Sequence, residues 1–173
     1  GTTNGAAAGS VFRRQMNNGD GTFSGPISIG TGVYRSATSL GDLDGDGDLD
    51  LIVTGRSNGA AAGYVFRRYL NDGGGTFSGP TSVGAGVYYS SSSLGDLDGD
   101  GDLDLIVTGQ DSSSVNHLDK YMNNGDGTFT GPTSVGTGVY YSSASLGDLD
   151  GDGDLDLILT GFASGPVYYL RKY

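Results

Sequence analysis

The sequence repeats one acidic stretch, GDLDGDGDLDLI, at residues 41–52, 95–106 and 147–158. Each copy places five aspartates at alternate positions over nine residues and then continues into an apolar run. Carboxylates held this close repel one another, by roughly 4 kcal/mol for a pair about 4 Å apart at an effective dielectric near 20. A bound cation would remove that repulsion, which makes each stretch a candidate metal-binding loop.

The spacing within each loop favours calcium. Counted from the first aspartate, the acidic positions are 1, 3, 5, 7 and 9, and position 6 is a glycine that permits a sharp turn. Several carboxylate oxygens that converge on one point suit Ca²⁺, which takes roughly 6–8 oxygen ligands at about 2.3–2.6 Å. The candidate ligands are Asp42, Asp44, Asp46, Asp48, Asp50, Asp96, Asp98, Asp100, Asp102, Asp104, Asp148, Asp150, Asp152, Asp154 and Asp156. We therefore expect about three Ca²⁺ ions per chain.

We expect side-chain oxygens from positions 1, 3, 5 and 9 and a backbone carbonyl from position 7, whose side chain would face water. In the first loop the side-chain ligands would be Asp42, Asp44, Asp46 and Asp50. The residues at position 7, for which the sequence leaves backbone and side-chain binding open, are Asp48, Asp102 and Asp154.

The loop is not an EF-hand. That motif needs Glu at position 12, where this chain has Val53, Val107 or Leu159. Mg²⁺ is disfavoured because it prefers waters and strict octahedral geometry to a cage of protein ligands. Zinc and copper are disfavoured because the loops contain neither His nor Cys.

The loops belong to a longer repeat, because they follow one another after 54 and then 52 residues. Each leads into a strand-like run, LDLIVTG or LDLILTG, and the complete copies continue with a second such run, a turn before GTF(S/T)GP, and a run such as TSVGAGVYYSSSSL. Four strands in a period of about 40–60 residues are typical of propeller blades. We predict an all-β, β-propeller-like array of about three four-stranded antiparallel blades.

The terminal blades are predicted to be incomplete within a single repeat domain. Because residues 1–14 align with 55–68, we expect a partial blade with strands 3 and 4 at 1–33. Repeats at 34–87 and 88–139 and a partial blade with strands 1 to 3 at 140–173 would follow. The third strand would then occur four times and every other strand three times. Since unfinished blades expose strand edges, we expect self-association into a filament or a closed oligomer.

The acidic loop and the hairpin turn NNGDGTF together resemble the FG-GAP/VCBS repeats of calcium-binding β-propellers, which include the integrin α-subunit head. The resemblance covers essentially the whole chain, and the pattern D-x-D-x-D-G-x-x-D fits all three loops. SLGDLDGDGD replaces the FG-containing first strand, which is closer to the bacterial VCBS type. The resemblance implies Ca²⁺ between the first two strands of each blade, an extracellular or cell-surface location, and adhesion or carbohydrate binding in some members.

The charge distribution argues against nucleic acid as a partner. Fifteen of the 20 acidic residues lie in the three loops, and the rest of the chain has nine basic residues against five acidic ones. The net charge of −11 is therefore local. No apolar stretch reaches the roughly 18 residues that a membrane span needs. The start at Gly1 is interpreted as that of a processed product or a fragment.

The sequence predicts no enzyme. His117 is the only histidine and has no counterpart in the other repeats, so we interpret it as incidental. Paired-carboxylate catalysis needs one carboxyl with a raised pKa, whereas a metal would keep these aspartates ionised. The serines of 90–93 have no base in a recognisable motif beside them.

The predicted function is that of a calcium-binding extracellular protein in structural assembly or adhesion. One alternative is a lectin-like module; another is an accessory domain of a larger secreted protein. The expected partners are further copies of the chain and a glycan or protein ligand. The tyrosines that could stack on sugars, or else pack between blades, are Tyr34, Tyr88, Tyr89, Tyr140 and Tyr141.

Overall fold

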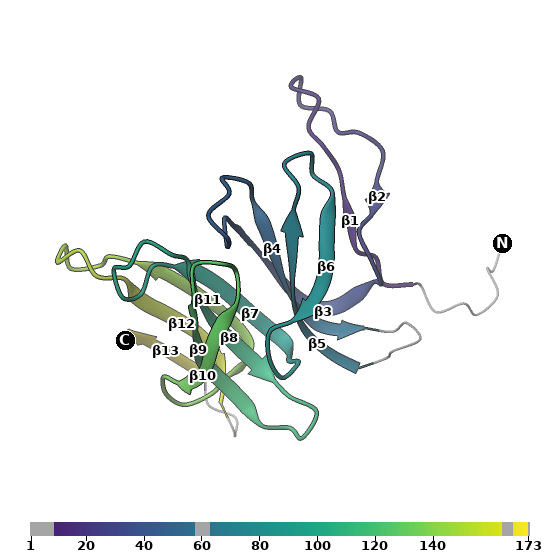
Figure 1. The fold of residues 1–173 in the computed structure, drawn as a ribbon. Helices are drawn as coiled ribbons and strands as arrows, with labels where there is room; N and C mark the ends of the chain where they lie inside the picture. Colours follow the sequence, from purple (N-terminus) through teal and green to yellow (C-terminus); the bar gives the residue numbers. More distant parts are fainter. Residues whose placement is uncertain (1–8, 58–62, 164–167, 173) are drawn as a thin grey trace.

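The computed structural model describes residues 9–57, 63–163 and 168–172, and these residues form antiparallel β-sheets without any helix (Figure 1). The first sheet, here called blade 1, contains β1 (Arg13–Arg14) and β2 (Ile27–Ser28). Blade 2 contains β3 (Val33–Gly41), β4 (Asp50–Ser57), β5 (Gly63–Asn71) and β6 (Phe77–Ser82). Blade 3 contains β7 (Tyr88–Gly95), β8 (Asp104–Gln110), β9 (Asn116–Asn123) and β10 (Phe129–Ser134). Blade 4 contains β11 (Tyr140–Gly147), β12 (Asp156–Phe162) and β13 (Tyr168–Lys172).

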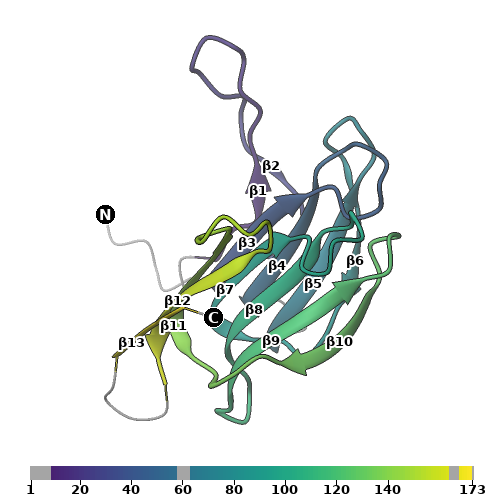
Figure 2. The same ribbon diagram turned by 90° about the vertical axis from the view of Figure 1, so that its left-hand side faces the viewer.

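Each blade is a meander in which strands pair with their neighbours in the sequence. The two central blades have four strands, whereas blade 1 has two and blade 4 has three. The blades follow one another in a row, and the described residues do not close into a ring (Figures 1 and 2). The predicted all-β, propeller-like array with incomplete terminal blades is therefore confirmed.

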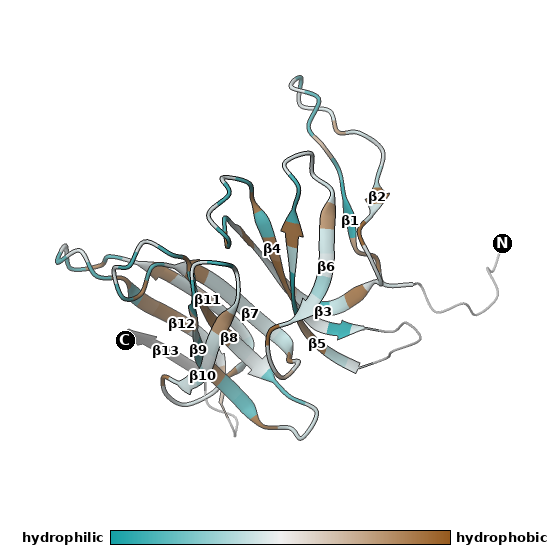
Figure 3. Ribbon diagram, viewed as in Figure 1, coloured by the Kyte–Doolittle hydropathy of each residue, from teal (hydrophilic) through white to brown (hydrophobic). Residues whose placement is uncertain are grey.

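The apolar core lies between the blades. The central strands β4 and β8 are buried on both faces, as their continuous LIV runs predict, and Figure 3 shows apolar colour along these strands. The core between blades 2 and 3 consists of Leu43, Ile52, Phe66, Val87, Leu105, Val107 and Tyr121. Similar clusters lie between the other neighbouring blades.

Serine and threonine side chains on the first and second strands connect neighbouring blades. The Ser39 hydroxyl on β3 lies 2.7 Å from the Ser92 hydroxyl on β7. Thr54 reaches Ser90 at 2.8 Å in the same interface. The serine run 90–93 is therefore part of β7 and forms hydrogen bonds between blades.

The tyrosines form a stack across the blades. Tyr89 and Tyr141, at equivalent places on β7 and β11, have ring centroids 3.7 Å apart. The guanidinium of Arg35, the equivalent residue of β3, lies 4.3 Å from the Tyr89 ring centroid. All three residues have positive φ, between 49° and 51°, where a bulge shifts the register of the first strand. These tyrosines therefore pack between blades.

Candidate metal centres

The three acidic loops connect the first and second strands of blades 2, 3 and 4 and lie along the same edge of the array (Figure 1). The first aspartate of each loop fixes its turn. Asp42 accepts hydrogen bonds from the backbone N–H groups of Gly45 at 2.8 Å and Gly47 at 3.0 Å. Both glycines have positive φ, which their lack of a side chain permits. Asp96 and Asp148 make the same two contacts in their loops.

The aspartate at position 9 anchors the loop to the blade. Asp50 and Asp104 are fully buried. One oxygen of Asp50 accepts a hydrogen bond from Leu43 N–H at 2.9 Å, and the other accepts one from Asn71 N–H at 2.8 Å. Asp104 makes the equivalent bonds in blade 3. In blades 2 and 3 the position 9 carboxylate therefore joins its loop to the end of the third strand.

Positions 1, 3 and 9 bring their carboxylates together. In each loop one oxygen from each of the three residues lies within 4.8 Å of the others. The three clusters are Asp42, Asp44 and Asp50; Asp96, Asp98 and Asp104; and Asp148, Asp150 and Asp156.

The aspartates at positions 5 and 7 lie outside these clusters. Those at position 5 accept a hydrogen bond from the backbone N–H two residues later, as Asp46 does from Asp48 at 2.9 Å. Asp100 and Asp152 make the same contact. At position 7, the Asp48 carboxylate lies against Gly73 and that of Asp102 against Gly125, in the turn between the third and fourth strands. Only Asp154 has the exposed side chain expected at position 7.

Two aspartates of the clusters have raised pKa values, because burial and neighbouring charges disfavour their ionised forms. Burial, followed by the charges of Asp50 and Asp46, raises the pKa of Asp44 above its ordinary value of 3.8. Burial also raises the pKa of Asp104, although hydrogen bonds from Asn123 and Leu97 partly offset it. A bound cation would act in the opposite direction, because it favours the charged form.

The residues present fit a hard cation. The Oδ1 atom of Asp44 is buried and has no hydrogen-bond partner among the described residues. A buried carboxylate oxygen without a partner is costly, and a bound cation would satisfy it. The three clustered side chains are all carboxylates, which suits Ca²⁺.

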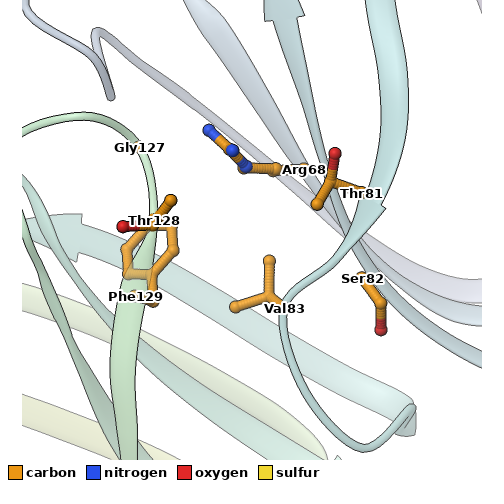
Figure 4. A pocket seen from close by; sticks show the side chains of 7 residues that line it. All are labelled: Arg68, Thr81, Ser82, Val83, Gly127, Thr128 and Phe129. Carbon is orange, nitrogen blue, oxygen red and sulfur yellow. The ribbon is translucent and has the colours of Figure 1, made fainter.

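A small cavity lies between blades 2 and 3, away from these clusters. It measures about 140 Å³ and is lined from both sides, by Arg68 and Val83 of one blade and by Thr128 and Phe129 of the other (Figure 4). Arg68 also donates to the backbone carbonyl of Asp126 at 3.3 Å. Since ligand pockets usually measure about 300–1,000 Å³, this cavity is a feature of blade packing.

His117, which the sequence pattern presents as incidental, is part of a side-chain network. Its Nδ1 atom lies 2.8 Å from Asp119 and its Nε2 atom lies 3.2 Å from Asp111. Asp119 is two residues further along β9, on the same face of the strand, and this spacing is the available sequence signal. Asp111 belongs to the variable loop before β9, where no repeat pattern indicates a partner. The histidine therefore joins this loop to the strand.

The family comparison agrees with this geometry. A model of the FG-GAP-like repeat matches residues 3–53, 42–107 and 96–159, so the matches extend over nearly the whole chain. The chain belongs to the FG-GAP-like repeat family. The second and third matches each begin at the first aspartate of one acidic loop and run past the next loop. The comparison with curated proteins finds no match.

FG-GAP repeats often bind Ca²⁺, and the three aspartate clusters could hold such ions. The family is generally non-enzymatic and typical of extracellular proteins with an adhesive, propeller-like architecture. In the described part of this FG-GAP chain, no helix is long and apolar enough to cross a membrane.

Proposed function

We propose that this chain is a non-enzymatic, calcium-binding extracellular module that acts in structural assembly or adhesion, with one Ca²⁺ in each acidic loop. The observation that carries the proposal is the convergence of three carboxylates in every loop, with a buried oxygen of Asp44 left without a partner. The same arrangement in three successive blades favours a structural role for the ions over a single regulatory site.

The ions would stabilise the blades. Asp50 belongs to a cluster and also accepts the Asn71 N–H, so an ion would fix the loop and the end of β5 together. A ligand present at 100 times its dissociation constant stabilises a protein by about 2.7 kcal/mol per site. Extracellular calcium modules often bind with dissociation constants of about 10⁻⁴–10⁻³ M. Such affinities suit a protein that works outside the cell.

A lectin-like role is the weaker candidate. The tyrosines that would stack on sugars pack against one another, as Tyr89 and Tyr141 do, and Tyr64 and Tyr88 have ring centroids 4.7 Å apart. These ring contacts lie within the array, although Tyr141 is still 53% exposed, and they favour the structural role.

Thermal unfolding in calcium and in excess chelator tests the proposal. We expect the melting temperature to fall clearly in chelator and to recover when Ca²⁺, but not an equal concentration of Mg²⁺, is restored. The same melting temperature in both conditions would contradict the calcium sites. A glycan array in calcium tests the lectin-like role separately.

A further inference from the structure

A groove of about 790 Å³ lies between blades 1 and 2. Blade 1 packs on blade 2 in the manner of the later blades: the ring centroids of Phe12 and Tyr69 are 5.2 Å apart, and those of Phe66 and Tyr121, one repeat later, are 5.0 Å apart. However, blade 1 has only its two outer strands among the described residues. Leu40 and Leu49 of blade 2, which are 59% and 56% exposed, line the groove beside them.

The next blade shows how this pair of leucines is normally covered. Leu94 and Leu103, the equivalent pair in blade 3, pack against Gly41 of blade 2. A Cβ atom added to this glycine would lie 2.9 Å from Leu94 Cδ1 and 2.6 Å from Leu103 Cδ1. The pair in blade 4 packs against Gly95 in the same way. The glycine that ends each first strand is therefore a seat for two leucines of the following blade.

The last seat is open. No described atom lies within 4 Å of a Cβ atom added to Gly147, the equivalent glycine of blade 4. Leu149 beside it is 49% exposed, whereas its counterpart Leu43 is 1% exposed. Ile158 is half-buried, whereas its counterpart Ile52 is fully buried. Blade 4 thus presents the surface that blades 2 and 3 use to cover a leucine pair.

We propose that β11 and β12 of a second copy of this chain occupy the groove, with Leu40 and Leu49 of one copy seated on Gly147 of the other. The inference rests on the proposed structural role and identifies its partner. Complementary apolar surfaces at opposite ends of one molecule make this contact head-to-tail.

The polar groups at the two ends of the array also match. Inside the chain, Thr108 of blade 3 hydrogen-bonds Ser142 of blade 4 at 2.6 Å. The next threonine in this series, Thr160 in blade 4, is exposed, and so is the first serine, Ser36 in blade 2. Docking of β11 and β12 into the groove would pair these two residues across the copies.

The composite blade would take its first two strands from one copy and its fourth strand, β2, from the other. Both β13 of one copy and β1 of the other are third strands. The composite blade has room for only one of them, so the other must be displaced. Each copy then contributes three blades. Two copies would close a six-bladed ring, within the usual range of about four to eight blades, and a contact that does not close would produce a filament.

Mass measurement by light scattering after size exclusion, in saturating Ca²⁺, tests the contact. The groove variant is Leu40→Asp, which lies outside the acidic loop, and the seat variant is Gly147→Leu. Both alter open positions, so each should fold as a monomer, which circular dichroism and calcium titration verify. Val115→Asp is the matched control, because Val115 is exposed to a similar degree, 52% against 59% for Leu40, but lies outside the groove.

We expect a dimer or larger assembly for the unaltered chain and for Val115→Asp, and a monomer for each contact variant. Mixing the groove and seat variants leaves one working contact, so the mixture should form 1:1 dimers and nothing larger. A monomeric unaltered chain, or a mixture that stays monomeric, overturns the inference. If such a monomer still binds three Ca²⁺ ions, the calcium function stands; an assembly that binds no calcium would overturn the calcium function instead.

Discussion

The Oδ1 atom of Asp50 accepts a hydrogen bond from the backbone N–H of Asn71, 2.8 Å away at the end of the third strand of its blade. Asp104 and Asn123 repeat this bond at 2.8 Å in the next blade. In blades 2 and 3, the most deeply buried carboxylate of the cluster is thus also the group that joins the acidic loop to the sheet. Calcium in the loop would therefore stabilise the blade as well as the loop.

Replacing Asp44 with Asn should have opposite effects with and without calcium. In chelator, we expect a higher melting temperature, because the substitution removes a charge whose pKa is raised by burial and by neighbouring carboxylates. In calcium, the stabilisation should fall by about one third, or about 2.7 kcal/mol at 100 times the dissociation constant, since one of three sites loses a ligand. Thermal melts in both conditions measure the two effects.

Asp126→Asn is the matched control for this substitution. Asp126 lies outside the acidic loops and accepts hydrogen bonds from the backbone and hydroxyl groups of Thr128. Its substitution should leave the calcium stoichiometry at three. A lower melting temperature for Asp44→Asn in chelator would contradict the assignment of Asp44 as a strained ligand.

Acidification should reduce the stabilisation by calcium. In the metal-free chain the pKa values of Asp44 and Asp104 lie above 3.8, chiefly because of burial. Their protonation favours the folded metal-free chain, so this contribution is present at low pH and is lost as the pH rises through the raised values. Calcium binds the ionised carboxylates, so the stabilisation by calcium has the opposite pH dependence and is lost as the pH falls. The difference in melting temperature with and without Ca²⁺ should shrink between pH 7 and pH 4; a constant difference would argue against carboxylate ligands.

His117 should make stability in saturating calcium depend on pH above 6.5. Burial lowers its pKa, but the hydrogen bonds to Asp111 and Asp119 and their charges outweigh burial, so the pKa lies above 6.5. The stabilisation is complete below pH 6.5 and is lost as the pH rises through the raised value. Urea unfolding from pH 6 to pH 9 should show this loss for the unaltered chain and a flatter profile for His117→Gln. The same dependence of stability on pH in both proteins would contradict the ion pairs of His117 with Asp111 and Asp119.

The glycine seats should differ in their tolerance of a larger side chain. Gly95→Leu should destabilise the fold by about 1–3 kcal/mol, because Leu155 and Leu146 occupy the space that the new side chain needs. Gly147→Leu should change stability by no more than about 0.5 kcal/mol. Urea unfolding of both variants in the Leu40→Asp background, where the groove contact is absent, gives the comparison. An equal loss of stability in the two variants would show that the space beside Gly147 is not open.

The repeat period and the aspartate spacing predicted the blades and the acidic loops, because both depend on local chain geometry. The alternation of aspartates did not reveal which carboxylates converge. Asp46 instead caps the N–H of Asp48, whose own carboxylate lies against Gly73 in a turn far along the sequence. That difference depends on the path of the backbone within the loop and on packing against the next hairpin.

The sequence did not predict the contacts between blades either. Gly41 ends a strand, and its function as a seat for Leu94 and Leu103 follows only from the placement of the next blade. The pairing of Asp111 with His117 depends in the same way on the path of one variable loop. Long-range packing decides these features, and a repeat pattern gives no direct signal for them.

Isothermal titration of the metal-free chain with Ca²⁺ measures how many of the three clusters bind an ion. The three clusters predict three ions per chain, and two for Asp44→Asn. A titration that shows no calcium binding to the folded chain, or an unchanged stoichiometry for Asp44→Asn, would contradict the assignment of the three aspartate clusters as calcium sites.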